Sequence, residues 1–533
     1  MDLNTPQSTK LQNKQIEADY DSRPYESNAH FYTAPGHIRA AAHLYGVETV
    51  PLARARVLEL GCAAGGNLLP FALMYPEATV VGVDLSSVQV AQGQEVINDL
   101  GVKNMQLHAM SLTDITPAFG QFDYIVAHGV FSWVPPDVKT AILRICNENL
   151  SPQGIAYVSF NTYPGWKAGD VVRDAVLLAS HGAQTEQERL GRAKAMFTVL
   201  TDGLAPGNGM GNALRALVEQ LRSQSDYYLL HEHLALVNTP CYLVEFADAA
   251  VQAGLTYVGD SEPNTELAAT YGPNVQLTQS VIALGQNKIM RQQFLDFAVS
   301  RSFRKALLVH GERGTTALPD LGRLRDLRFA APFVAKPAQD GQPAGYTSRR
   351  QQFISGAEPG IEPLVKALGE AWPRSLGWEA LDQALTERVA DTQERQRVLS
   401  SAIQTLFAQG VLHLSLGDDP YEEAGAASLV PGFAYLARRN WEGPRGVGCF
   451  NAWHETLSLS LTPAQYWIVE ELERGFELKR VAAELSQALQ RGDVPGNDGV
   501  SRKGQRNLSA LATNMVRELT LLLRRRGVVL GDA

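Results

Sequence analysis

Residues 57–67 constrain the fold of this chain more than any other stretch, because they read VLELGCAAGGN. The apolar run before the first glycine is typical of a strand that is buried on both faces of a parallel sheet. Gly61 and Gly65 have no Cβ, so the turn that follows can bring its backbone close to a ligand. Asn67 then suits a helix N-cap, and Pro70 falls in the first helical turn, where its missing N–H is tolerated. The stretch predicts a strand, a glycine turn and a helix, the layout of a nucleotide-type site at the end of a strand.

A second apolar strand, TVVGVD over residues 79–84, ends in a carboxylate. Asp84 lies 23 residues after Gly61. That spacing suits an acidic side chain that accepts hydrogen bonds from the hydroxyls of a ribose. At this point two cofactor classes remain open, a dinucleotide and S-adenosylmethionine.

The glycine pattern decides between these two cofactors. A dinucleotide fold needs three glycines, spaced G-x-G-x-x-G, to seat a pyrophosphate at a helix N-terminus. Here the third residue of that pattern is Ala63, and Glu59 stands just before the turn. A carboxylate at this place repels a pyrophosphate but suits a sulfonium and an amino-acid ammonium. The stretch from Glu59 to Gly65 resembles motif I of class I S-adenosylmethionine-dependent methyltransferases, which implies that cofactor.

The residues around this stretch predict an α/β fold with a doubly wound, Rossmann-like parallel sheet. Helical segments alternate with further strands over 102–109, 122–127 and 154–160. Ligands of such sheets lie outside the carboxyl ends of the strands. We therefore expect residues 56–167 to form a cofactor-binding methyltransferase core, preceded over residues 1–55 by a polar lead and a helical cap.

The rest of the chain divides into three parts. Residues 168–310 predict a mainly helical middle domain, and residues 311–350, rich in Gly, Pro, Thr, Asp and Gln, predict a linker. Within residues 351–533 the order helix, glycine and short strand occurs twice. This echo predicts an α+β C-terminal region with two winged-helix-like subdomains.

Composition and cysteine usage narrow the class of protein. The chain has 533 residues, a formal net charge of −9 and 45% hydrophobic residues, as expected of a multidomain globular protein. Neither a signal peptide nor a membrane-spanning stretch is visible, and the acidity gives no support to nucleic-acid binding. The cysteines, at positions 62, 146, 241 and 449, are far apart, which suits a reducing compartment and argues against a zinc site. We expect a cytoplasmic protein without membrane insertion and without a metal.

Two loops at the carboxyl ends of the predicted strands carry candidate catalytic side chains. His128 follows residues 122–127 and suits a base or a cofactor contact, although a histidine with one satisfied hydrogen bond is an equal interpretation. Asn161 and Tyr163 follow the next strand and offer a carbonyl acceptor and a phenol to an incoming amine. Tyr25, in the polar lead, suits either a lid over the cofactor or a tail packed on the surface.

Three further stretches resemble a bacterial group of class I methyltransferases that carry a methyltransferase regulatory domain. They are SFNTYPGW over 159–166, VNTPCY over 237–242, and FLDF over 294–297 followed by Phe303-Arg304. The resemblance covers roughly residues 15–310 and implies a methyltransferase core, a helical middle domain and a C-terminal domain. The best understood members are rickettsial protein lysine methyltransferases that modify an outer-membrane protein. The resemblance therefore implies lysine as the methyl acceptor, and a homodimer as the assembly to test for.

The cofactor residues are carried over from this group position by position. The glycine turn and Asp84 match its motifs, whereas Ala64 stands where an acidic residue often provides a polar contact. Met110 stands where an acid commonly faces the adenine edge, so adenine recognition falls to backbone groups and Ser111. The expected cofactor-binding residues are Glu59, Gly61, Cys62, Ala63, Gly65, Asn67, Asp84, Leu85, Ser111, Leu112 and His128.

Together these observations predict an S-adenosylmethionine-dependent methyltransferase that N-methylates lysine side chains of a protein substrate, with an envelope protein as a candidate. The expected catalytic residues are Asn161, Tyr163, His128 and Tyr25. Two alternatives stay open, a small-molecule methyltransferase and a cofactor-binding regulatory module without transfer activity. No nucleic-acid partner is expected.

Overall fold

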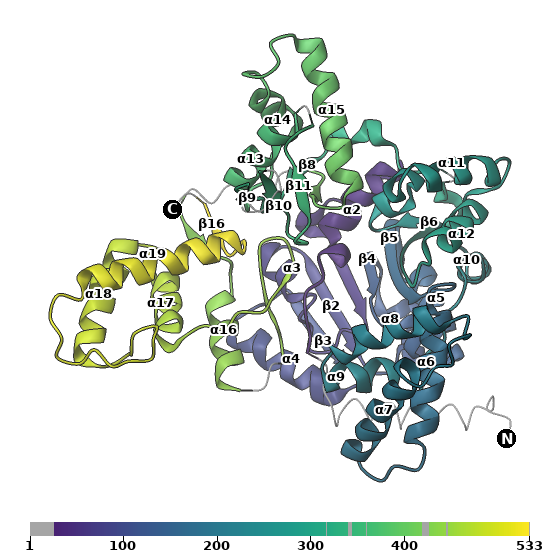
Figure 1. The fold of residues 1–533 in the computed structure, drawn as a ribbon, viewed down its shortest axis with the longest axis horizontal. Helices are drawn as coiled ribbons and strands as arrows, with labels where there is room; N and C mark the ends of the chain where they lie inside the picture. The colour runs from purple at the N-terminus through teal and green to yellow at the C-terminus, as the bar shows by residue number, and fades with distance from the viewer. Residues whose placement is uncertain are drawn as a thin grey trace.

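A seven-stranded sheet forms the centre of the molecule (Figure 1). The computed structural model describes residues 26–315, 317–338, 344–358, 360–417, 426–443 and 446–531. The strands of the sheet are β1 (Arg56–Leu60), β2 (Thr79–Asp84), β3 (Met105–Ala109), β4 (Phe122–Ala127), β5 (Leu150–Asn161), β6 (Leu255–Asp260) and β7 (Phe303–His310). Their spatial order is β3-β2-β1-β4-β5-β7-β6, and β1 to β5 run parallel to their neighbours among themselves. The carboxyl ends of these five strands therefore lie at one edge, as the Rossmann-like prediction requires.

The last two strands of the sheet come from the middle part of the chain. β7 pairs antiparallel with β5 on one side and with β6 on the other. Residues 306–309 of β7 are an apolar run that is buried on both faces of the sheet. The segment that we expected to be mainly helical thus also extends the core sheet, beyond the predicted boundary at residue 167.

Alternate residues of the strands point to opposite faces of the sheet, and each face is covered by helices. Val57 belongs to one apolar cluster, whereas Leu58 and Leu60 belong to the other. The first face packs against α2 (Pro35–Leu44), α3 (Leu69–Met74) and α4 (Ser87–Asp99), and the second against α5 (Pro136–Glu148) and α10 (Leu243–Gln252). The predicted helix and strand order of the core is confirmed.

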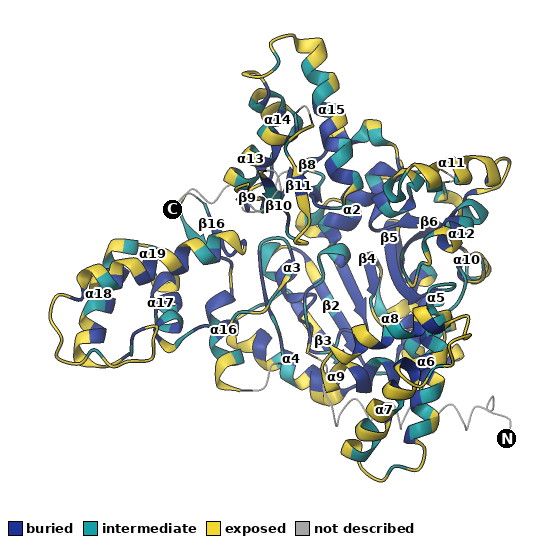
Figure 2. Cartoon of the chain, viewed as in Figure 1, coloured by how far each residue is buried: buried dark blue, intermediate teal, exposed yellow. Residues whose placement is uncertain are grey.

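The middle segment forms a helical layer beside the core. Its elements are α6 (Trp166–Ser180), α7 (Glu186–Thr201), α8 (Gly211–Arg222), α9 (Asp226–Tyr228), the π-helical turn η6 (Leu229–His233), α11 (Pro273–Ile282) and α12 (Lys288–Val299). Val172, Phe197 and Leu214 give α6, α7 and α8 an apolar cluster of their own. Figure 2 shows that the outer faces of these helices are exposed, while the strands of the sheet are buried.

The expected linker over residues 311–350 is packed rather than extended. Leu324 and Phe329 are fully buried, and they join the apolar cluster of α13 (Ile361–Ala371), α14 (Trp378–Ala384) and α15 (Thr392–Ala408). This part also holds β8 (Arg328–Ala330), the sheet β11-β10-β9 (Phe353–Ser355, Gly345–Thr347, Val334–Lys336) and β12 (His413–Ser415). The turn-forming residues 311–350 therefore connect short strands of a folded unit.

The remaining C-terminal elements share the apolar cluster of the first sheet face. They are β13 (Ser428–Leu429), α16 (Phe433–Glu442), β14 (Cys449–Phe450), β15 (Thr456–Leu457), α17 (Pro463–Arg474), α18 (Leu478–Arg491), α19 (Ser509–Arg525) and β16 (Val529–Leu530). The predicted order of helix, glycine and strand occurs twice, since Gly410 separates α15 from β12 and Gly527 separates α19 from β16. Both short strands pair antiparallel, β12 with β8 and β16 with β13. In the part of the chain that the structure describes, none of the helices is both long and apolar enough to cross a membrane.

Candidate active site

The glycine turn after β1 adopts the backbone that its residues predict. Gly61 and Gly65 have φ angles of 76° and 74°, in the left-handed region that favours glycine. A Cβ at Gly61 would lie 2.4 Å from Cγ2 of Val130, so the turn is packed directly against the loop that follows β4. Ala63 also has a positive φ, of 49°, although it carries a side chain. The turn is thus closely fitted to its surroundings.

Asp84, at the end of β2, ties this turn to the next loop. Its Oδ2 accepts a hydrogen bond from the amide of Ala63 at 2.8 Å, and its Oδ1 accepts one from the amide of Ser86 at 2.9 Å. The side chain contacts the cavity at the carboxyl edge of the sheet. A carboxylate fixed by two backbone amides is a rigid acceptor for ligand hydroxyls.

Glu59 is buried near the end of β1, beside the glycine turn. Its Oε1 accepts a hydrogen bond from Nδ2 of Asn67 at 2.7 Å, but its Oε2 is buried without a hydrogen-bond partner among the described residues. Burial raises the pKa of Glu59 to about 8. An unpaired buried carboxylate oxygen is costly unless a cationic group reaches it, and Glu59 is one of the residues that line the cavity.

We predicted that Asn67 caps a helix, and this prediction is wrong. The helix α3 begins two residues later, and Leu68 takes the N-cap position. Instead its Oδ1 accepts hydrogen bonds from the His30 amide and the Thr33 hydroxyl, both at 2.9 Å, and lies 3.2 Å from Nε2 of His454. Asn67 therefore joins Glu59 to the N-terminal segment and to the C-terminal region. Pro70 does fall in the first turn of α3, as predicted.

The N-terminal segment is pinned between the glycine turn and the C-terminal region. The hydroxyl of Ser27 accepts a hydrogen bond from the amide of Gly66 at 2.7 Å. On its other side, the Ser27 amide donates to the carbonyl of Gly446, and its carbonyl accepts from the amide of Gly448, both at 2.9 Å. The N-terminal segment, which lines the cavity at Ser27, is thus hydrogen-bonded to the C-terminal region on its other side.

The cavity has a volume of about 1610 Å³, including the space at its mouth. Ten of the eleven predicted cofactor residues line it, and the exception is Gly65. A Cβ at Gly65 would lie 2.6 Å from Cε of Met105, so this glycine provides room for packing within the core. The lining residues that we predicted are Glu59, Gly61, Cys62, Ala63, Asn67, Asp84, Leu85, Ser111, Leu112 and His128.

Of the predicted catalytic residues, the structure places His128 at the cavity. Its Nδ1 lies 3.1 Å from the hydroxyl of Tyr157 and 3.0 Å from that of Ser159, and its ring lies 4.5 Å from the ring of His30. Burial, followed by the charges of His30 and Lys305, lowers the pKa of His128 well below its ordinary value. The imidazole is therefore neutral near pH 7, which suits a contact that orients a ligand better than a proton acceptor.

Asn161 and Tyr163 do not line this cavity. The side chain of Asn161 donates to Oδ1 of Asn238 at 3.1 Å, which joins β5 to the middle segment. The hydroxyl of Tyr163 donates to Oδ2 of Asp170 at 2.7 Å, and the ammonium of Lys167 lies 3.5 Å from the centre of its ring. Tyr25 lies outside the described residues. The cavity thus brings together ten of the predicted cofactor residues, and of the predicted catalytic residues that the structure describes, His128 is the one that lines it.

Sequence reasoning missed three lining residues from the middle segment. Tyr228, His231 and Glu232 lie on α9 and the π-helical turn η6 and line the same cavity as Asp84. The available signal was the group HEH over residues 231–233, which interrupts an otherwise apolar run. Nothing in the local pattern connects that group to a glycine turn so far away in the chain.

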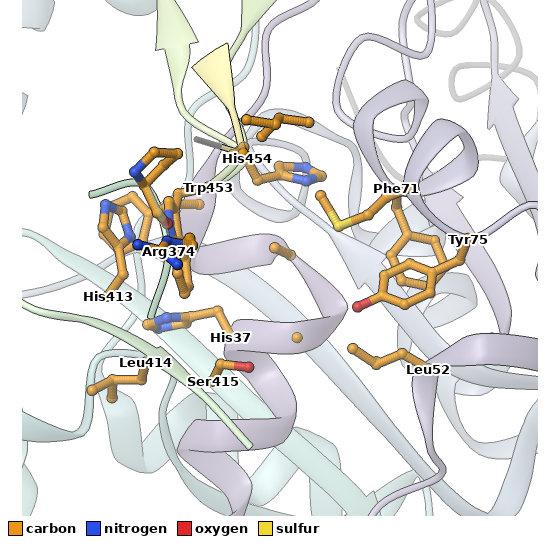
Figure 3. A pocket seen from close by; sticks show the side chains of 18 residues that line it. His37, Leu52, Phe71, Tyr75, Arg374, His413, Leu414, Ser415, Trp453 and His454 are labelled. Atoms are coloured by element: carbon orange, nitrogen blue, oxygen red, sulfur yellow. The ribbon is translucent and has the colours of Figure 1, made fainter. Parts of the chain in front are cut away.

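A second, small cavity lies where α2, α3 and the C-terminal region meet (Figure 3). The side chains labelled in Figure 3 are His37, Leu52, Phe71, Tyr75, Arg374, His413, Leu414, Ser415, Trp453 and His454. His413 stacks on Trp453 with ring centres 5.0 Å apart. His454 also contacts Asn67, so the C-terminal region touches the residue that positions Glu59.

The residues at the cofactor cavity fit S-adenosylmethionine. The unpaired oxygen of Glu59 suits an ammonium, Asp84 suits a ribose, and the tight turn at Gly61 lets the backbone approach a ligand. Fold and site together define a class I methyltransferase domain.

Comparison with known families agrees with this class. Residues 57–154 match the family described as "Methyltransferase domain", and residues 225–310 match "Predicted methyltransferase regulatory domain". The first match indicates S-adenosylmethionine as the cofactor. The chain belongs to the family of methyltransferase-domain proteins that carry this regulatory domain.

Individual relatives include two uncharacterized proteins of Rickettsia prowazekii. RP028 is 37% identical over 232 residues, which cover 43% of this chain and 93% of that protein. RP789 is 39% identical over 295 residues, which cover 55% of this chain and 53% of that protein, so the match spans about half the length of RP789. The solved structure of PKMT2 from Rickettsia typhi also matches, with a TM-score of 0.81 and 24% sequence identity. The match covers 95% of this chain and 100% of the PKMT2 chain. That likeness shows that the two proteins share a fold.

Proposed function

We propose that this protein is an S-adenosylmethionine-dependent methyltransferase that N-methylates lysine side chains of a protein substrate. The observation that carries the proposal is the unpaired, buried carboxylate oxygen of Glu59, in a cavity that Asp84 also lines. A nucleotide with a pyrophosphate would be repelled there, whereas a cationic amino-acid end would be bound.

In this proposal the residues of the chain bind and orient the reactants. Glu59 and the backbone of the glycine turn hold the methionine end, and Asp84 holds the ribose. Leu85, Leu112 and Ser111 line the cavity for the adenine. S-adenosylmethionine supplies an electrophilic methyl group on a positively charged sulfur. Because an in-line displacement needs mainly positioning, a cavity whose walls are fixed by hydrogen bonds, as at Asp84 and Ser27, is suited to this step.

A protein lysine as the acceptor is supported by the family resemblance and by the fold shared with PKMT2. An envelope protein remains our candidate substrate, and a homodimer our candidate assembly. None of the four cysteines forms a disulfide, as suits the cytoplasmic site of action that we propose.

The proposed function is tested by incubating the purified protein with methyl-labelled S-adenosylmethionine and a cell-envelope extract, and mapping the label by mass spectrometry. We expect label on lysine Nζ atoms of one or a few proteins, with release of an equal amount of S-adenosylhomocysteine. Label on a small molecule would replace the protein acceptor in this proposal. If cofactor binds but no label is transferred, the protein is a cofactor-binding module and the proposed reaction is wrong.

Replacing Asp84 by alanine should weaken the binding of S-adenosylmethionine by about a hundredfold, because the change removes a charged acceptor and also frees the amides of Ala63 and Ser86. Isothermal titration of the purified variant measures the effect. Asp114→Ala, at an exposed acid in the same domain, is the matched control and should bind normally. Unchanged affinity of Asp84→Ala would remove the ribose assignment.

A further inference from the structure

A π-helical turn of the middle segment reaches the cofactor cavity. In η6 the amide of Leu234 donates to the carbonyl of Leu229 at 3.0 Å, five residues earlier, which is the π-helical pattern. Tyr228 and Glu232, four residues apart, both line the cavity. Single π turns inside helical segments frequently occur at functional sites.

This turn is held in place from its far side. The guanidinium of Arg173 donates to the carbonyls of His233 and Ala235, at 3.0 and 2.6 Å, and Arg189 donates to the carbonyl of Leu234. The turn's apolar residues are buried in the cluster of α6, α7 and α8. Two arginines on two helices thus determine where the turn lies, and its position at the cavity is built into the fold.

Among the described residues, none forms a hydrogen bond or ion pair with the carboxylate of Glu232. It is partly buried, and burial raises its pKa to about 7. Three other carboxylates line the cavity: Asp84 is fixed by two amides, Glu59 accepts from Asn67 beside the glycine turn, and Glu26 belongs to the N-terminal segment. Glu232 therefore lines the cavity without a partner in the part of the chain that the structure describes, and the proposed cofactor contacts do not involve it.

We propose that Glu232 binds the methyl acceptor as a primary ammonium and takes up its proton, and that the acceptor class is accordingly an alkylammonium such as lysine Nζ. This inference rests on the proposed function. Tyr228, which lines the same cavity, offers a ring on which the cation can lie. The regulatory domain, which begins at residue 225, in this account supplies part of the acceptor site.

The chemistry requires a proton acceptor at this place. A lysine ammonium has no lone pair, so it must lose one proton before it can attack. That proton passes to the carboxylate of Glu232. The nitrogen lone pair then forms the N–C bond to the methyl carbon while the C–S bond breaks, and its electron pair returns to sulfur. The positive charge moves from sulfur to nitrogen, and Glu232 releases its proton to water.

Two other bases of the cavity, His30 and His128, are less suited to this transfer. Burial lowers the pKa of His30 to about 4, and that of His128 lies well below its ordinary value, so both rings hold a proton poorly near pH 7. The titratable and charged groups that share the cavity with Glu232, or hold its turn, are Glu26, His30, Glu59, Cys62, Asp84, His128, Arg173, Arg189, Tyr228, His231 and His233.

The test compares the full-length protein with Glu232→Gln, using S-adenosylhomocysteine to fill the cofactor site. Two probes are titrated and followed by NMR: Nα-acetyl-lysine amide and its neutral counterpart Nα-acetyl-norleucine amide. The wild-type protein should bind the lysine probe at least about tenfold more tightly than the norleucine probe, and Glu232→Gln should lose this preference. Its affinity for S-adenosylhomocysteine should change by less than about twofold, since Glu232 faces the acceptor.

Glu219→Gln, at an exposed acid on α8 that pairs with Arg222, is the matched control and should behave as wild type. A preference for the lysine probe that survives in Glu232→Gln would overturn the inference, as would a large loss of S-adenosylhomocysteine affinity. Because this comparison needs no methyl transfer, it decides the role of Glu232 even if the label experiment fails.

A second readout separates proton uptake from simple binding. The transfer rate of the wild-type protein should rise as the pH passes through about 7, because Glu232 must be ionised to accept the proton. Glu232→Gln should transfer slowly and lack this inflection. The same inflection in the variant would show that another group of the cavity takes the proton, and would overturn that part of the inference.

Discussion

Replacing Glu59 by glutamine is expected to weaken the binding of S-adenosylmethionine by at least about tenfold while leaving the folded protein as stable as before, or more so. The amide oxygen of the glutamine can still accept the hydrogen bond from Asn67. Its amide nitrogen, however, replaces the free carboxylate oxygen and cannot accept from an ammonium. Loss of affinity without loss of stability is the signature of a charge that is kept for a ligand.

The pKa of Glu59 also predicts how the stability difference between wild type and Glu59→Gln changes with pH. The pKa of Glu59 in the folded protein, about 8, lies above the ordinary value of a carboxyl group, 4.5, because burial favours the neutral form. The neutral form of Glu59 contributes its full stabilisation below pH 4.5, the ordinary pKa. This contribution is lost as the pH rises through about 8, the pKa in the folded protein. Without cofactor, Glu59→Gln should therefore gain thermal stability relative to wild type between about pH 5 and pH 8.

Calorimetric titration and thermal unfolding of the same samples measure both effects. Glu77→Gln is the matched control, since Glu77 is an exposed acid of the same domain and pairs with Arg54 on the surface. Such pairs contribute at most about 1 kcal/mol, so this variant should bind and unfold like wild type. Undiminished cofactor affinity in Glu59→Gln would show that the methionine end lies elsewhere.

Replacing Gly66 by alanine should detach the N-terminal segment from the glycine turn. The new Cβ would lie 2.0 Å from the carbonyl oxygen of Ser27 and 2.5 Å from its carbonyl carbon, which are backbone atoms without rotamers to relieve the clash. Ser27 cannot move away freely, because Gly446 and Gly448 hold its amide and carbonyl from the other side. We expect a cost of about 1–3 kcal/mol and a cofactor affinity at least about tenfold lower.

Hydrogen exchange locates this effect. The amides of residues 26–30 and 446–450 should exchange faster in Gly66→Ala, because both segments hydrogen-bond through Ser27. Gly191→Ala is the matched control: Gly191 lies within α7 with open space around its Cα, so alanine there should be neutral or stabilising. Unchanged exchange at residues 446–450 in Gly66→Ala would show that the N-terminal segment does not link the two regions.

The cofactor half of the site was predictable because its signals are local. Glu59, the turn glycines and Asp84 each lie at or just after the end of a strand. Short apolar runs in the sequence indicate where these strands are. Once the sheet is parallel, its carboxyl ends meet at one edge without further information. For this reason the lining residues of the turn and of the β2 and β3 loops could be named from the sequence.

The parts that sequence reasoning missed depend on contacts between distant residues. Asn67 is a residue type that often caps helices. Here, however, its side-chain oxygen contacts His30, Thr33 and His454, and His454 is 387 residues away in the sequence. Glu232 reaches the cavity because arginines of α6 and α7 fix the turn that carries it. The strand β7 is recognisable as an apolar run, yet nothing local shows that it joins β5 in the core sheet. Such placements come from packing, which a single sequence does not display.

A crystal structure of the full chain with S-adenosylhomocysteine tests the central claim most directly. We expect the amino-acid ammonium at Oε2 of Glu59, the ribose hydroxyls at Asp84, and the sulfur facing the part of the cavity lined by His128 and Glu232. S-adenosylhomocysteine bound in another cavity, or with its ammonium away from Glu59 and its sulfur away from Glu232, would contradict the account.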